Sequence, residues 1–127
     1  MRYIGIDYGN KKVGVALSDE NGEMAFPHSV LKNDDNFVDD ILGLIRVHKA
    51  TVVIGDSRAN DGSENPIAKE AKMFAARLEE DNVVVRFEPE FYTSQEAERI
   101  QGRTDMTDAS AATLMLNSYL RRNATHI

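Results

Sequence analysis

The sequence predicts an α/β fold, with helices on both faces of a mixed five-stranded sheet. The first thirty residues read as apolar strands separated by turn residues, which is typical of an antiparallel meander. After residue 33, amphipathic helical segments alternate with short apolar runs. Strand–helix–strand crossovers place the two later strands parallel in the same sheet. The length of 127 residues suits one domain, spanning residues 1–127, with a single core.

The meander is expected to contain three strands, at residues 2–7, 12–18 and 25–30. Gly9 and Asn10 separate the first two strands and supply the turn chemistry of a hairpin. Pro27 cannot donate a hydrogen bond to a neighbouring strand, so it marks the third strand as an edge strand or an irregular one.

The second half is expected to contain helices at residues 34–48, 66–80, 93–101 and 107–122, and strands at 51–55 and 82–88. Asn33 is the expected cap of the first helix. Asn65 and Pro66 fit an N-cap followed by proline at the first helical position. Thr93 with Glu96 fits a capping box, and Asp105 or Thr107 caps the last helix.

Composition narrows the classes of function. The net charge of −6 argues against strong sequence-independent nucleic-acid binding, which normally needs a broadly basic surface, although a local basic patch remains compatible. There are no cysteines, so a disulfide framework and a thiolate metal site are both excluded. No apolar run is long enough to cross a membrane, and no signal-peptide pattern is present, so we expect a cytoplasmic protein.

Three carboxylates are expected to meet at one end of the sheet. Asp7 closes the first strand, Glu90 follows the last strand, and Asp108 opens the last helix. Sites in open α/β sheets lie beyond the carboxyl ends of the parallel strands. A carboxylate cluster without cysteine suits Mg²⁺ or Mn²⁺, and two such ions about 3.5–4 Å apart can activate a water for phosphodiester hydrolysis.

Each candidate residue also has a structural interpretation. Asp108 could be a first-turn helix acid, and Asp105 could be either a cap or a fourth metal ligand. Glu88 is expected to be an exposed strand residue. Two tyrosines, Tyr8 and Tyr92, could stack on bases or pack at the rim of the site.

Basic residues near the carboxylates are candidates for phosphate contacts. Lys11 and Lys12 project from the same hairpin as Asp7, and we favour a phosphate-binding role for them. Arg58 and Arg99 could extend this surface, with solvated charge as the alternative interpretation of each.

The chain resembles the YqgF-type family of the RNase H-like superfamily, whose members are candidate Holliday junction resolvases and candidate pre-16S rRNA nucleases. Four blocks in the family's order carry the resemblance: residues 5–19, 61–64, 90–98 and 108–120. It implies an RNase H-like fold, a nuclease acting on structured RNA or branched DNA, and Asp7, Glu90 and Asp108 as metal-binding acids. A resolvase that cuts two strands symmetrically would suit a homodimer.

The chain departs from the family pattern at two places. Pro89-Glu90-Phe91 stands where the family usually has Asp-Glu-Arg, and residues 55–59 lack an asparagine usual after the fourth strand. A module that binds nucleic acid, a ribosome-assembly partner or a transcription partner without cleavage is therefore the alternative function. A nucleotide-dependent phosphotransferase is a third one, because the Asp7-Tyr8-Gly9 hairpin is similar to the phosphate loop of actin and sugar kinases.

Overall fold

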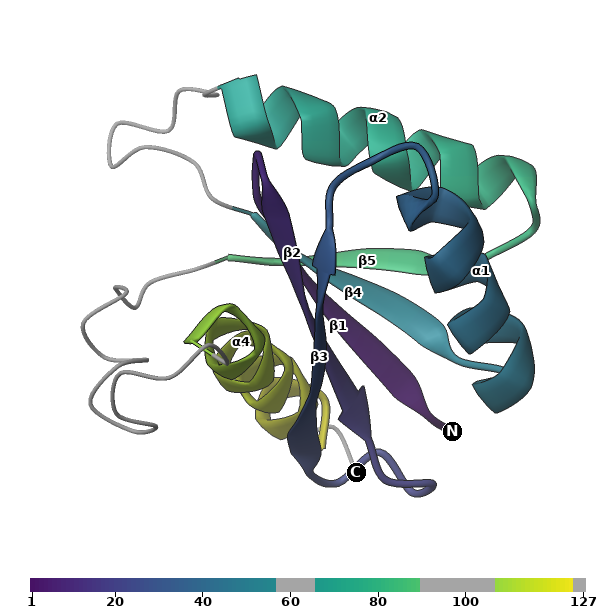
Figure 1. Cartoon of the computed structure of the whole chain (residues 1–127). Helices are drawn as coiled ribbons and strands as arrows, with labels where there is room; N and C mark the ends of the chain where they lie inside the picture. The colour runs from purple at the N-terminus through teal and green to yellow at the C-terminus, as the bar shows by residue number, and fades with distance from the viewer. Residues whose placement is uncertain (57–65, 90–106, 125–127) are drawn as a thin grey trace.

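A computed structural model describes residues 1–56, 66–89 and 107–124 of the chain (Figure 1). Its five strands form one sheet in the order β3-β2-β1-β4-β5. The strands are β1 (Tyr3–Tyr8), β2 (Lys12–Ser18), β3 (Ala25–Lys32), β4 (Thr51–Asp56) and β5 (Val85–Pro89). β1, β2 and β3 pair antiparallel, whereas β4 joins β1 and β5 in parallel. The predicted mixed sheet is confirmed.

Helices cover both faces of this sheet, as predicted. The described helices are α1 (Phe37–His48), α2 (Pro66–Glu80) and α4 (Thr107–Ala124). Figure 1 shows α1 and α2 on one face and α4 on the other. Each face has its own buried apolar cluster. None of the described helices is long and apolar enough to span a membrane.

The central strand β1 serves both faces because successive side chains of a strand point in opposite directions. Ile4 and Ile6 are fully buried in the cluster beneath α1 and α2. Gly5 faces α4, where an added Cβ would lie 2.9 Å from the Leu116 Cβ and 3.2 Å from the Ala112 carbonyl oxygen. Glycine at position 5 therefore allows α4 to approach the sheet closely, with the small side chain of Ala112 buried at the contact.

The start of the first helix differs from the prediction. α1 begins at Phe37 with Asn36 as its N-cap residue, so the predicted cap at Asn33 is wrong. The Asn33 side chain instead donates to the Gly9 carbonyl oxygen at 2.8 Å, and its backbone N–H donates to the Lys11 carbonyl oxygen at 2.9 Å. Asn33 thereby ties the end of β3 to the β1–β2 hairpin, a tertiary role that local cap patterns do not reveal.

Two strand boundaries also differ from the prediction. β3 continues to Lys32, and its pairing with β2 is irregular between Val15 and Ala16, opposite Pro27, as the proline predicted. β5 begins at Val85 rather than at residue 82. Asn82 has a φ of 65° and its N–H bonds back to the Glu79 carbonyl, so it belongs to the turn that ends α2.

Asp19 organises the turn that connects β2 to β3. Its Oδ1 accepts hydrogen bonds from the N–H groups of Glu23 (2.8 Å) and Met24 (3.3 Å). The bond from Glu23 is the main cause of a lowered pKa for the Asp19 carboxyl. The ionised side chain therefore closes this turn.

Candidate active site

Asp7 lies near the carboxyl end of β1, opposite Gly14 of β2, and its side chain is half-buried. Strand alternation places Asp7 on the same face as Gly5, which is the face that α4 covers. Tyr8, the next residue, lies on the other face and packs against Phe37 and Phe74. Tyr8 therefore makes a packing contact, but on the face opposite Asp7 and not at the rim of the candidate site.

The direction of α4 brings its first turn toward Asp7. Tyr3, at the start of β1, contacts Tyr119 with ring centroids 5.7 Å apart. Gly5, two residues further along, lies against Leu116 and Ala112. The helix therefore runs antiparallel to β1, and its first turn, which contains Asp108, lies beyond Gly5 in the direction of Asp7. The structure describes the helical backbone at Asp108 and not its side chain.

The other predicted acids lie outside the described residues. Glu90 directly follows Pro89, the last residue of β5, and Asp105 precedes α4 by two positions. Among the described residues, no group of three or more histidines, aspartates or glutamates could hold a metal ion. The predicted donors are all carboxylate oxygens, a set that fits a hard cation such as Mg²⁺ or Mn²⁺.

Lys11 and Lys12 are both exposed at the tip of the β1–β2 hairpin. Gly9 makes this hairpin possible, because an added Cβ would lie 2.4 Å from the Lys12 carbonyl oxygen. The two lysines therefore stand at the same end of the sheet as Asp7. Arg58, Arg99 and Tyr92 lie outside the described residues.

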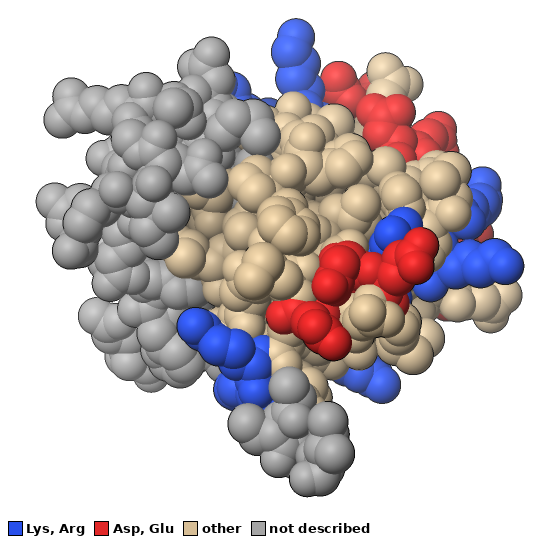
Figure 2. Space-filling view, turned by 90° about the horizontal axis from the view of Figure 1, so that it is seen from below, with Lys and Arg blue, Asp and Glu red and all other residues tan. Residues whose placement is uncertain are grey.

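The face in Figure 2 carries a group of acidic side chains, scattered basic ones and a wide uncharged area. No continuous basic surface covers the part of this face that is described. This agrees with the net charge of −6.

Glu88 contradicts the prediction that it is an exposed strand residue. It is only 2% exposed, and its carboxylate accepts hydrogen bonds from Ser118 Oγ at 3.0 Å and Arg122 Nη2 at 2.5 Å. The partner of Glu88 on β4 is Gly55, and Gly55 follows Ile54, the partner of Ile6 on β1. Glu88 therefore lies in the same row across the sheet as Asp7. Two strand spacings, or about 10 Å, separate the Cα atoms of the two residues.

The contacts of its buried carboxylate give Glu88 a structural role. They attach β5 to the last turns of α4. Sequence reasoning missed this contact because Arg122 is 34 residues away; the available signal was the alternation of β5, which puts Glu88 on the face that α4 covers.

Comparison with solved structures shows that the chain shares the fold of two resolvases. The structure titled "T. thermophilus RuvC in complex with Holliday junction substrate" matches with a TM-score of 0.61 at 15% identity, over 98% of this chain and 96% of that chain. The structure of the Fowlpox virus resolvase with Holliday junction DNA matches with a TM-score of 0.62 at 13% identity, over 97% and 99% of the two chains. At these identities the likeness establishes the fold.

Sequence comparison establishes the family. The model of the family described as "RuvX: Holliday junction resolvase" matches residues 1–122, so the chain belongs to this family. Relatives carry the name "Putative pre-16S rRNA nuclease". One from Nitratidesulfovibrio vulgaris is 34% identical, with 94% of this chain and 93% of that protein covered. One from Syntrophus aciditrophicus is 37% identical, with 94% and 88% covered. The predicted family resemblance is confirmed.

Proposed function

We propose that this protein is a metal-dependent nuclease that hydrolyses phosphodiester bonds in structured nucleic acid. The observation that carries the proposal is the half-buried Asp7 at the carboxyl end of β1, on the face where the first turn of α4 brings Asp108. Carboxylate oxygens are the ligands that Mg²⁺ and Mn²⁺ prefer, so an acid in this position suits a metal site. Membership of the RuvX family supports the same function.

Asp7, Glu90 and Asp108, with Asp105 as a fourth candidate, would hold Mg²⁺ or Mn²⁺. When bound, the metal would supply Lewis-acid activation of a water molecule and stabilisation of the leaving oxygen. Asp108 at a helix N-terminus is favoured in its ionised form by the helix dipole. Lys11 and Lys12, with Arg58 and Arg99, would contact phosphates on either side of the scissile bond and fix the register of the substrate.

The names of the relatives and of the family indicate two substrates. The relatives carry the name of a pre-16S rRNA nuclease and the family is described as a Holliday junction resolvase. We therefore propose processing of the 5′ end of pre-16S rRNA, or resolution of Holliday junctions. We propose structured RNA or branched DNA as the substrate class, with the protein acting in the cytoplasm. Symmetric cleavage of a junction would require a homodimer, whereas cleavage of a single RNA strand would not.

Cleavage assays with purified protein test the proposal. Wild-type protein with Mn²⁺ should cut a precursor rRNA fragment or a four-way DNA junction, and Asp7→Asn should abolish the activity. Asp39→Asn, an exposed acid in the first turn of α1, is the matched control and should retain activity. Equal cleavage by wild type and Asp7→Asn would show a contaminating nuclease and refute the assignment.

A non-cleaving binding module is the second candidate, and the sequence Pro89-Glu90-Phe91 favours it, because an acid and a basic residue usual in the family are absent there. Such a module would bind RNA or DNA equally well in EDTA and with Mn²⁺, without turnover. Affinity measured under both conditions separates the two functions, since a metal-bridged substrate complex weakens when the metal is removed.

A further inference from the structure

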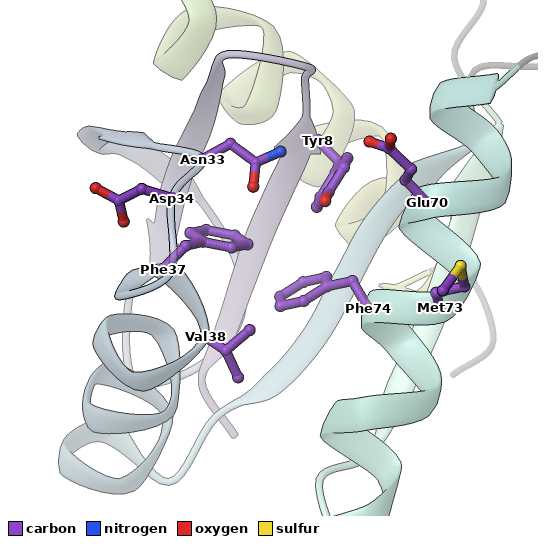
Figure 3. Close-up of a pocket in the computed structure, with 8 residues that line it drawn as sticks. All are labelled: Tyr8, Asn33, Asp34, Phe37, Val38, Glu70, Met73 and Phe74. Atoms are coloured by element: carbon purple, nitrogen blue, oxygen red, sulfur yellow. The ribbon is translucent and has the colours of Figure 1, made fainter.

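A pocket lies between α1 and α2, beside the end of β1 (Figure 3). Its volume is about 260 Å³. The aromatic rings of Tyr8, Phe37 and Phe74 form its floor, with centroids 4.9 to 6.0 Å apart. Since Tyr8 and Asp7 point to opposite faces of the sheet, the pocket is separate from the candidate metal site, although both lie at the same end of β1.

The rim of this pocket combines apolar side chains, Val38 and the exposed Met73, with polar side chains that are neutral or negative. Asn33, Asp34 and Glu70 line it, and no lysine or arginine is among the described residues that do so. In Figure 3 the Glu70 carboxylate points toward Tyr8, whereas the Asp34 carboxylate points outward. Asp34 Oδ1 accepts a hydrogen bond from the Asn36 N–H at 3.0 Å. Within the described part of the chain, the exposed Glu70 carboxylate has no hydrogen-bond or ion-pair partner.

The combination of an aromatic floor with a carboxylate rim selects a particular ligand chemistry. A guanidinium group is planar and cationic; it stacks on aromatic rings and forms paired hydrogen bonds with a carboxylate. A nucleobase would also stack on the rings, but the phosphates attached to it would lie near two carboxylates and be repelled. The charge of the rim therefore favours a cation over a nucleotide.

The volume of the pocket indicates the size of the group that it can bind. Small-molecule and cofactor sites usually have volumes of about 300–1,000 Å³. The volume of about 260 Å³ falls below that range and suits one side chain. We infer that this pocket binds an arginine side chain of a basic partner protein, with the guanidinium stacked on the aromatic floor and paired with Glu70. The inference does not depend on the proposed nuclease activity.

Peptide titrations of the full-length ¹⁵N-labelled protein, followed by NMR, test the inference. The probe is Ac-Gly-Arg-Gly-NH₂, and the control peptide has citrulline, the neutral analogue of arginine, in its place. Amide signals of Tyr8, Phe74 and Glu70 should shift to saturation with the arginine peptide. The citrulline peptide should bind at least about fivefold more weakly, because it lacks the cation–π and ion-pair contributions.

Matched variants locate the binding. Glu70→Gln should weaken binding of the arginine peptide about fivefold, whereas Glu79→Gln, an exposed acid further along α2, should leave it unchanged. Because Glu70 is exposed, its substitution should preserve the fold, which the melting temperature checks. Three outcomes overturn the inference: equal binding of both peptides, equal effects of the two variants, or tighter binding of guanosine or uridine monophosphate at the same amides.

Discussion

Glu88 of β5 and Arg122 of α4 form an ion pair whose carboxylate is 2% exposed, although Arg122 itself is 58% exposed. The pair attaches the edge strand of the sheet to the end of the helix whose first turn contains the candidate metal ligand Asp108. Because Ser118 also donates to Glu88, this carboxylate accepts bonds from two successive turns of α4. The position of α4 on the sheet therefore depends on a buried charge as well as on apolar packing.

The two partners of this ion pair should respond unequally to substitution. Arg122→Ala leaves a buried carboxylate without its counter-charge and should lower the free energy of unfolding by roughly 3 kcal/mol. Glu88→Gln leaves Arg122 able to reach water and keeps a hydrogen-bond acceptor, so its cost should be about 1–2 kcal/mol. Urea denaturation measures both, with exposed Arg121→Ala as control. An effect of Arg121→Ala as large as that of Arg122→Ala would contradict the role of the pair.

Two glycines should respond in opposite directions to substitution by alanine. Gly5→Ala brings a Cβ to 2.9 Å from the Leu116 Cβ, so α4 must shift, and we expect a loss of about 1–3 kcal/mol. Gly43→Ala lies in α1 with nothing within 4 Å of the new Cβ and should stabilise the protein by about 0.5–1 kcal/mol. Thermal unfolding of both variants checks this. Equal effects of the two substitutions would exclude close packing at Gly5.

The two asparagines before α1 should differ in their contribution to the stability of the protein. Asn33→Ala removes the bond to the Gly9 carbonyl oxygen and should cost about 1 kcal/mol. Asn36→Ala should cost less than about 0.5 kcal/mol, because the Asn36 side chain makes no capping hydrogen bond. Chemical denaturation distinguishes the two variants. A larger loss of unfolding free energy for Asn36→Ala would mean that capping of α1 is the main contribution of this segment.

Asp19 should make stability depend on pH in acid. Its pKa is lowered from the model-compound value of 3.8, chiefly by the hydrogen bond from the Glu23 N–H, so the ionised form stabilises the turn. This contribution is present above pH 3.8 and is lost as the pH falls through the folded-state pKa. The difference in melting temperature between wild type and Asp19→Ala should therefore shrink below pH 3.8. A difference that persists unchanged into strong acid would show that the charge of Asp19 is irrelevant.

Lys11 and Lys12 should account for part of the salt dependence of nucleic-acid binding. Each lysine that neutralises a phosphate releases counterions, so replacing both by alanine should weaken binding and reduce the slope of log K against log salt by about 1–2. Arg46→Ala, in the last turn of α1 at the other end of the sheet, is the control. An unchanged slope in the double variant would remove the lysines from the proposed interface.

The sequence was a good guide wherever local chemistry decides the structure. Gly9 and Asn10 identified the hairpin, and short apolar runs identified the strands, because turn geometry and strand burial act over a few residues. Asn33 and Glu88 were misinterpreted because their partners lie far along the chain, in the hairpin and in α4. A side chain that suits a cap or an exposed edge suits a long-range hydrogen bond equally well.

The candidate site, like the fold, was predictable only where local sequence defines it. Asp7 could be placed because a buried strand leads directly into it, and the structure puts it on the face of α4. Convergence of Glu90 and Asp105 with Asp7 stays a prediction, since both lie outside the described residues. The aromatic pocket could not be foreseen, because it combines single residues from β1, α1 and α2 that no sequence spacing relates.

The alternation of side chains along β1 limits how the sequence of this strand can vary. Ile4 and Ile6 belong to the core, and Gly5 and Asp7 belong to the α4 face, so point substitutions can alter one set and leave the other intact. Insertion or deletion of one residue within the strand would exchange the two sets at once, turning the carboxylate into the core beneath α1 and α2 and the isoleucines against α4. The strand can therefore vary in composition and not in length, and homologous sequences should align across it without gaps.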